Sequence, residues 1–170
     1  MEGQLIVATP LATPLPTPAD ARRAVEATPD DARRVLFDFN KHALAQSMRT
    51  LGSTSVAVTY SGCGDSGQID EVGFQPADVD EGVHQVVVAQ MQYHWDAERA
   101  CGVNALAFVE MPLSDVAEAL CDTAVELAGH NGYENGDGGE GTFTLQAADA
   151  CAELEHRDFY TESDTSWHTL

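Results

Sequence analysis

The chain has 170 residues, which is enough for one domain with a hydrophobic core. Its 28 acidic and 8 basic side chains give a formal net charge of −20, and such a surface repels DNA, RNA and anionic membranes. No apolar run reaches the roughly 20 residues of a membrane-spanning helix, and the N-terminus lacks the basic start of a signal peptide. We therefore expect a cytoplasmic protein that binds neither nucleic acid nor membrane directly.

Acidic side chains are spread along the whole sequence rather than gathered in blocks. This distribution favours a surface charge that keeps the protein soluble, as in salt-adapted organisms. Two other interpretations stay open. The charge could mimic a nucleic acid and occupy the basic groove of another protein, as a phage-type inhibitor does. It could also serve to bind cations.

The four cysteines are too far apart in sequence to form a C-x-x-C knuckle, so a zinc ribbon is not predicted. Cys121 lies in an apolar helical context, which predicts a small buried core residue. Cys63 lies in a glycine-rich stretch, which predicts an exposed thiol without an adjacent base.

The first 28 residues contain three Thr-Pro pairs at a period of four, Thr9-Pro10, Thr13-Pro14 and Thr17-Pro18. Proline fixes φ and cannot donate a backbone hydrogen bond, so residues 1–28 are predicted to form an extended, disordered arm. We expect a single α+β domain over residues 29–165 and a short C-terminal tail over residues 166–170.

Two main helices are predicted. The first begins at Thr28-Pro29 and ends before Gly52, with apolar residues at three-four spacing from Leu36 to Leu51. The second begins near Pro112 and ends at Gly129 or Gly132, and it carries a regular apolar stripe. Its opposite face carries an anionic stripe, which faces either solvent or a cationic partner. The stripe consists of Asp115, Glu118, Asp122 and Glu126.

Alternating segments predict strands over residues 53–60, 68–74 and 83–95, and a short one over 103–109. In the longest, the odd-numbered residues from Val87 to Trp95 share one face, and Val86 and Val88 lie on the other. A last hairpin is predicted with Ala148-Asp149 as its turn. Counting back from this turn places His156 opposite Gly141, and Glu140 opposite Arg157 as a cross-strand ion pair.

Two acidic, glycine-rich loops are the candidate binding surface, over Gly62–Glu71 and Tyr133–Gly141, together with His156 and Tyr160. Glycine supplies positive φ and close backbone approach in such loops. The residues proposed to bind are Gly64, Asp65, Ser66, Gln68, Glu134, Asn135, Asp137, Glu140, His156 and Tyr160.

We expect these loops to bind without a cofactor. The alternative is a site for a divalent cation. Asp65, Asp137 and Glu140 would be its oxygen ligands, and His156 would add either a nitrogen ligand or a general base. The sequence NGDGGEG lacks the spacing of an EF-hand loop, and residues 62–67 lack the lysine of a P-loop.

Three segments, YSGCGDSGQIDEV, GYENGDGGEGTFTL and ELEHRDFYTESDT, resemble in this order a small family of uncharacterised bacterial and phage proteins, a domain of unknown function. The resemblance covers roughly residues 36–165. Tyr133 stands where the family usually has Trp, and Cys63 where it usually has Ser. The resemblance implies that the two glycine-rich loops act as one feature, and it implies no activity, substrate or cofactor.

The sequence as a whole predicts an α+β fold, with two main helices packed on a mostly antiparallel sheet and a C-terminal β-hairpin. The favoured function is a non-enzymatic binding or regulatory module, because two unusual polar loops occur without a complete catalytic set. The alternatives are a divalent-metal-dependent hydrolase and an acidic nucleic-acid mimic. The expected partner is a protein with a basic surface.

Overall fold

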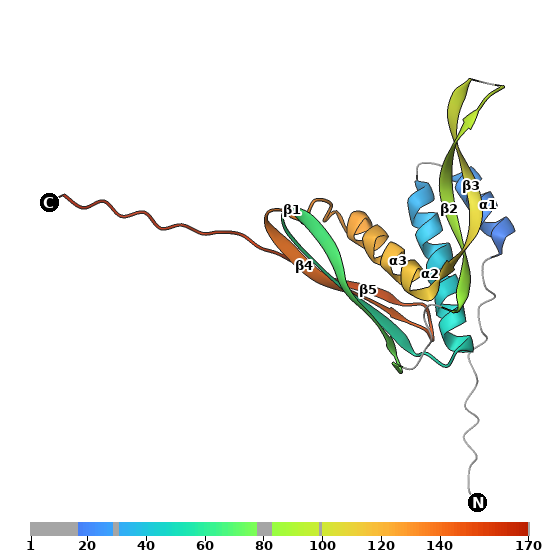
Figure 1. Ribbon diagram of the computed structural model, residues 1–170, viewed down its shortest axis with the longest axis horizontal. Coiled ribbons are helices and arrows are strands. Elements are labelled where there is room, and N and C mark those ends of the chain that lie inside the picture. Colours follow the sequence, from blue (N-terminus) through green and yellow to red (C-terminus); the bar gives the residue numbers. More distant parts are fainter. Residues whose placement is uncertain (1–16, 29–30, 78–82, 99, 170) are drawn as a thin grey trace, which may run out of the picture.

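The computed structural model describes residues 17–28, 31–77, 83–98 and 100–169 (Figure 1). Within these ranges the chain is α+β with mostly antiparallel sheets and a C-terminal hairpin, which confirms the predicted class. The elements are α1 (Pro18–Ala27), α2 (Ala32–Thr50), β1 (Ser55–Gln75), β2 (Gln85–Asp96), β3 (Cys101–Pro112), α3 (Leu113–Ala128), β4 (Asn135–Gln146) and β5 (Ala152–Asp158).

Helix α1 lies where the sequence predicts extended chain, so that prediction is wrong for residues 18–27. The cause is a capping box. The Asp20 amide donates to the Thr17 hydroxyl at 3.2 Å, and the Thr17 amide donates to the Asp20 carboxylate at 2.9 Å. Pro18 occupies the first helical position, where its missing amide hydrogen costs nothing. The earlier Thr-Pro pairs lie in residues 1–16, outside the described residues.

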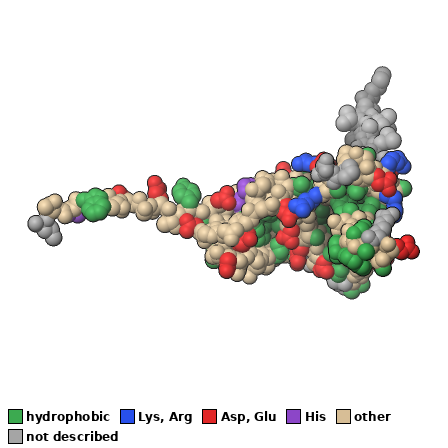
Figure 2. All heavy atoms as spheres, turned by 90° about the horizontal axis from the view of Figure 1, so that it is seen from above, with side chains coloured by type: hydrophobic (Ala, Val, Ile, Leu, Met, Phe, Trp, Pro, Cys, Tyr) green, Lys and Arg blue, Asp and Glu red, His purple; other side chains and the backbone are tan. Residues whose placement is uncertain are grey.

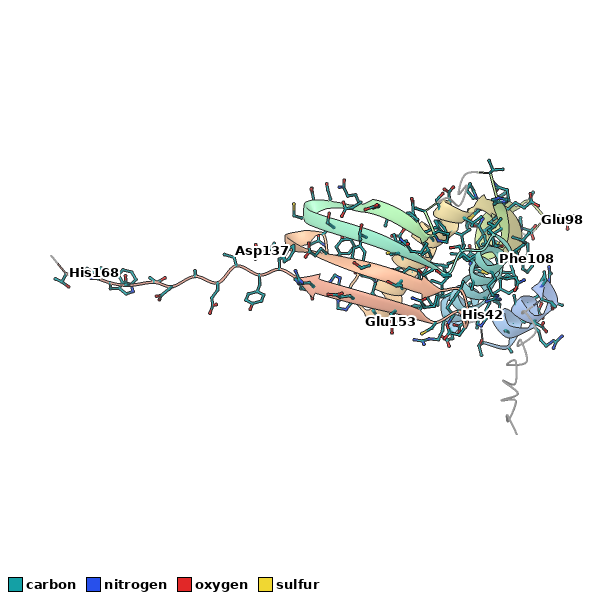
Figure 3. All side chains as sticks on the ribbon, turned by 90° about the horizontal axis from the view of Figure 1, so that it is seen from below. His42, Glu98, Phe108, Asp137, Glu153 and His168 are labelled. Carbon is teal, nitrogen blue, oxygen red and sulfur yellow. The ribbon has the colours of Figure 1, made fainter. Side chains whose placement is uncertain are left out.

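Strands β1, β4 and β5 form one antiparallel sheet in that order. Strand β1 doubles back on itself, because the Thr54 amide donates to the Gln75 carbonyl at 2.6 Å, and Figure 3 shows its two arms side by side. The predicted loop over residues 61–67 is therefore the turning end of β1, and residues 135–140 of the second predicted loop belong to β4.

The two glycine-rich segments pair with each other as strand ends. Gly62 lies opposite Gly139, Gly64 opposite Gly136 and Asp65 opposite Asn135. Glycine is required for this close approach, since a Cβ on Gly62 would lie 2.8 Å from the Cβ of Glu134. In the structure the two segments are paired strand ends, so the prediction that they form loops is wrong.

The hairpin of β4 and β5 has the predicted register. Gly141 lies opposite His156, and Glu140 lies opposite Arg157. The Arg157 guanidinium donates to the Glu140 carboxylate at 2.8 Å. The residue count from the turn was sufficient here, because the turn fixes every pair of a two-stranded antiparallel unit.

One buried cluster joins this sheet to α2, α3 and the base of the second sheet. Leu44 and Met48 of α2, Val58 of β1, Leu120 of α3 and Phe143 of β4 are all nearly inaccessible to solvent. Cys121 belongs to the same cluster, as predicted, and Cys63 is exposed, also as predicted. No helix in the described ranges is long and apolar enough to cross a membrane.

Strands β2 and β3 form a separate two-stranded ribbon that projects beyond the helices (Figure 1). The second strand is longer than the predicted 103–109. Along β2 the even-numbered Val86 and Val88 are buried, whereas Val87, Tyr93 and Trp95 are exposed. The alternation predicts which residues share a face. The odd-numbered face is buried only at Ala89, and its larger side chains are exposed.

Candidate functional site

Three residues form a row across the first sheet, at the end from which the C-terminal tail leaves. Tyr60 on β1 lies opposite Gly141 on β4, which lies opposite His156 on β5. A Cβ on Gly141 would overlap the Tyr60 hydroxyl, so glycine is needed there. The Tyr60 and His156 side chains consequently meet across Gly141, with Tyr60 Oη 2.7 Å from His156 Nδ1.

The second ring nitrogen of His156 faces a carboxylate on the same strand. His156 Nε2 lies 3.0 Å from Asp158 Oδ1, and these residues are two apart on β5, so they share one face. The His156 side chain is only 4% exposed, whereas that of Asp158 is 67% exposed. The imidazole is thus held at both nitrogens, from the interior by Tyr60 and from the surface by Asp158.

A second histidine reaches the same place from the end of α3. Gly129 ends this helix with φ 86°, and the His130 amide donates to the Val125 carbonyl at 3.1 Å, as in a Schellman motif. The His130 ring then lies 4.0 Å from the His156 ring, centroid to centroid. His130 Nδ1 lies 3.9 Å from Asp158 Oδ2.

Tyr60 keeps its proton at neutral pH. Burial raises the pKa of the Tyr60 hydroxyl, and the neighbouring Cys121, Tyr133 and Asp158 raise it further. A neutral phenol both donates and accepts a hydrogen bond, so Tyr60 can pair with either tautomer of His156. In one tautomer, Nδ1 accepts a hydrogen bond from the Tyr60 hydroxyl, and the protonated Nε2 donates a hydrogen bond to Asp158.

Tyr133 closes the aromatic side of the site. Its ring meets Tyr60 edge-on at 5.0 Å and His156 edge-on at 6.1 Å between centroids. Its hydroxyl reaches β1, because a Cβ on Gly67 would lie 2.7 Å from it. Burial, followed by nearby Asp122, raises the pKa of Tyr133, which therefore also stays neutral.

The donor atoms of His130, His156 and Asp158 all lie within 4.8 Å of one another, which suits a single metal ion. Among the described residues this is the one group of three such side chains. Of its members the sequence analysis identifies only His156. The spacing His156-x-Asp158 on a predicted strand was a usable signal for Asp158. His130 could not be found this way, because its position depends on how α3 packs.

The carboxylates proposed from the sequence as metal ligands do not form such a group. Asp137 accepts a hydrogen bond from the Thr161 amide, and Glu140 pairs with Arg157. Asp65 is exposed, and its carboxylate accepts a hydrogen bond from the Ser66 hydroxyl at 3.4 Å. Figure 3 shows Asp137 at the end of the sheet where the tail begins.

The other predicted binding residues lie around the paired strand ends. Gln68 donates to Asp70 at 2.9 Å, and Glu134 lies beside Gly62. Gly64 and Asn135 belong to the β1–β4 ladder. Tyr160 is 83% exposed in the tail that follows β5 and does not line the histidine site.

Comparison with protein families gives one match. The model of DUF6878, a family of unknown function, covers residues 36–170. The chain belongs to this family. The DUF6878 match includes every residue of the histidine site and leaves out α1, and it confirms the resemblance to a domain of unknown function. Comparisons with curated proteins and with solved structures give no match.

Proposed function

We propose that the chain is a non-enzymatic binding module whose ligand is a divalent transition-metal ion of the zinc class. His130, His156 and Asp158 would be its ligands. The observation that carries the proposal is the approach of these three donors to within 4.8 Å, with the His156 ring already oriented by Tyr60.

The donor set favours a transition metal over calcium or magnesium. Two imidazole nitrogens with one carboxylate oxygen suit zinc, nickel or cobalt, whereas calcium and magnesium take oxygen ligands almost exclusively. A metal-bound imidazole normally holds its other nitrogen in a hydrogen bond. Tyr60 supplies that bond, because its hydroxyl can accept from Nδ1–H while Nε2 binds the ion.

Metal binding would displace the proton that His156 Nε2 shares with Asp158. It would also tie the connection after α3 to the end of β5, from which the extended tail leaves. The ion would therefore stabilise the end of β5, where the tail begins. In this way metal binding would change the stability of one segment, as expected of a regulatory module. The glycine-rich strand ends support this junction rather than contributing ligands.

Thermal shift and calorimetric titration of the full chain test the proposal. We expect Zn²⁺ to raise the Tm and Mg²⁺ and Ca²⁺ to leave it unchanged. At a concentration of about 100 times Kd, the gain is about 2.7 kcal/mol. With Co²⁺, absorption bands of a low-symmetry tetrahedral site should appear. The heat of binding should depend on the buffer, since binding releases a proton.

Asp158 is exposed and His130 is half-buried, so substitution of these two ligands disturbs the fold less than substitution of the buried His156 side chain. Asp158→Asn and His130→Asn should abolish the Zn²⁺ shift while leaving the metal-free Tm nearly unchanged. The matched controls are Glu153→Gln, which removes another exposed carboxylate of β5, and His94→Asn on the ribbon; both should keep the full shift. Absence of any metal-dependent shift, or an equal loss in the controls, would rule out the site.

A metal-dependent hydrolase is the second candidate. Three protein ligands leave one position open on a tetrahedral ion, as in catalytic zinc sites. In this arrangement His156 is the nitrogen ligand rather than the general base, the two roles that the sequence leaves open for it. Hydrolysis of an activated ester by the zinc-loaded chain, lost in Asp158→Asn, would favour this candidate over simple binding.

A protein partner with a basic surface is supported by the net charge of −20. The anionic stripe of α3 gives it less support, because Glu126 of that stripe already pairs with Arg33 of α2. Salt-sensitive capture of a basic protein by the full chain would support such a partner.

A further inference from the structure

The β2–β3 ribbon has one apolar face that continues past the helices covering its base. Ala89 and its cross-strand partner Phe108 pack against Phe39 of α2 and Ala21 of α1. Farther along the same face of β2 come Met91, Tyr93 and Trp95, which are exposed, the last two at 70% and 62%. Hydrophobic side chains gather at this end of the molecule in Figure 2.

The outer edge of β2 is capped at Ala89, and no further strand of the described chain pairs with it along Met91, Tyr93 and Trp95. The Asn40 side chain donates to the Ala89 carbonyl at 2.9 Å and accepts from the Ala89 amide at 2.7 Å, as a neighbouring strand would. In an antiparallel pair, alternate residues direct both backbone groups to the same side. The backbone groups of Met91, Tyr93 and Trp95 therefore point to the same outer edge, where the described chain provides no further strand.

Charged side chains are missing from this part of a highly charged protein. No Asp, Glu, Lys or Arg occurs from Gln85 to Trp95 or from Cys101 to Val109. Exposed strand edges in soluble proteins are usually protected by charge, proline or a covering element. Depletion of charge together with exposed Met, Tyr and Trp is the composition of an interface core.

We propose that the outer edge of β2 pairs with the same edge of a second copy of this chain, antiparallel about a two-fold axis through the Met91–Trp95 segment. The two ribbons would then form one continuous sheet with a joint apolar face.

A second copy fits this edge better than a partner of opposite charge. An antiparallel edge is self-complementary under two-fold symmetry, since Met91 of each copy meets Trp95 of the other and the two Tyr93 residues meet at the axis. Each copy has a net charge of −20, so two copies repel each other at most surfaces. Contact through the uncharged ribbon brings the fewest like charges together. An aromatic side chain carries about 150–250 Å², so Tyr93 and Trp95 alone would contribute roughly 200–300 Å² per copy.

The test is sedimentation velocity of the full chain with EDTA present, so that a metal ion cannot bridge two copies. We expect a species of twice 18.2 kDa, populated more strongly as salt increases. Raising the salt from about 0.05 to 1 M shortens the Debye length and screens the repulsion between the copies. A partner recognised by its charge would show the opposite dependence on salt.

Matched variants locate the contact. Tyr93→Lys should weaken the dimer at least tenfold, because two ammonium groups would lie next to each other across the two-fold axis. Tyr160→Lys makes the same change at an equally exposed tyrosine in the tail and should leave the dimer unchanged. In a Trp167→Phe background, Trp95 becomes the sole tryptophan, and its emission should shift to the blue with rising protein concentration.

Three results would overturn the proposal. One is a protein that stays monomeric at every salt concentration, even at a protein concentration of about 100 μM, well above the micromolar Kd of a weak complex. A second is equal weakening by Tyr160→Lys, which would place the contact in the tail. A third is Trp95 emission that is blue-shifted and independent of concentration, which would mean that the chain covers its own ribbon.

Discussion

Tyr60 determines how His156 is oriented, and the two meet only because residue 141 has no side chain. Tyr60 is 2% exposed and bonds the interior nitrogen of His156, while Asp158 bonds the outer one. The position of His156 opposite Gly141 could be predicted from the sequence, because it depends on one local turn. Tyr60 could not, because its partner strand β4 lies about 80 residues farther along and no local pattern specifies that pairing.

The pKa of Tyr60 leads to a prediction at alkaline pH. An acid whose pKa is raised by folding contributes full stability below its unfolded pKa, near 10 for tyrosine, and loses it as pH rises toward the folded value. The wild-type Tm should therefore begin to fall near pH 10 and keep falling as the pH rises further. Tyr60→Phe should flatten this fall, and Tyr160→Phe, at an exposed position, should not.

At neutral pH, Tyr60→Phe removes the hydrogen bond to His156 and should cost about 0.5–1.5 kcal/mol of unfolding free energy, measured in urea. It should also weaken Zn²⁺ binding, since the histidine loses its oriented second nitrogen. An unchanged Tm profile across the alkaline range would show that Tyr60 ionises freely and is not held as described.

Gly141 gives a second prediction at the residue scale. Gly141→Ala would place a methyl group against the Tyr60 hydroxyl and the Glu155 carbonyl. The rearrangement should cost about 1–3 kcal/mol, measured by chemical denaturation. Gly73→Ala is the matched control in β1, because nothing lies within 4 Å of its added Cβ. Equal stability of the two variants would contradict the close packing across Gly141.

At the scale of elements, the glycine-rich segments show why the sequence does not predict the paired ends of β1 and β4. Glycine and acid residues are typical of turns, so both segments suggest loops. In the structure they pair, and glycine permits the two backbones to approach. The ribbon is a similar case, because alternation defines its two faces but does not tell how far along the strand the helices cover each face.

Helix α1 gives a prediction at this scale. Thr17→Ala removes the hydroxyl of the capping box and should destabilise α1 by about 1 kcal/mol. Amide hydrogen exchange should quicken in residues 18–27 and stay unchanged in α2. The loss of helix stability should be no larger than this, because the packing of Ala21 against Phe39 also holds α1 in place. Unchanged exchange in α1 would mean that packing alone holds the helix.

At the scale of the whole molecule, 28 acidic residues against 8 basic ones surround a fold with one main core. Several of the basic side chains are already paired within the chain, among them Arg33, Lys41 and Arg157. The remaining negative charge repels itself more strongly in the compact folded state than in the expanded chain. The same repulsion opposes association of two copies, so both the fold and the proposed dimer depend on ionic strength.

Salt should therefore stabilise the monomeric fold as well as the dimer, and the two effects can be separated. In the Tyr93→Lys variant, which we expect to be monomeric, the Tm should rise by several degrees between about 0.02 and 0.5 M NaCl and then level off as the Debye length approaches atomic distances. Glu153→Lys, at an exposed position of β5, should raise the Tm in low salt, and this gain should shrink as salt is added. A Tm that climbs linearly with salt, and more steeply in sulfate than in chloride, would instead indicate salt-driven hydrophobic burial rather than relief of charge repulsion.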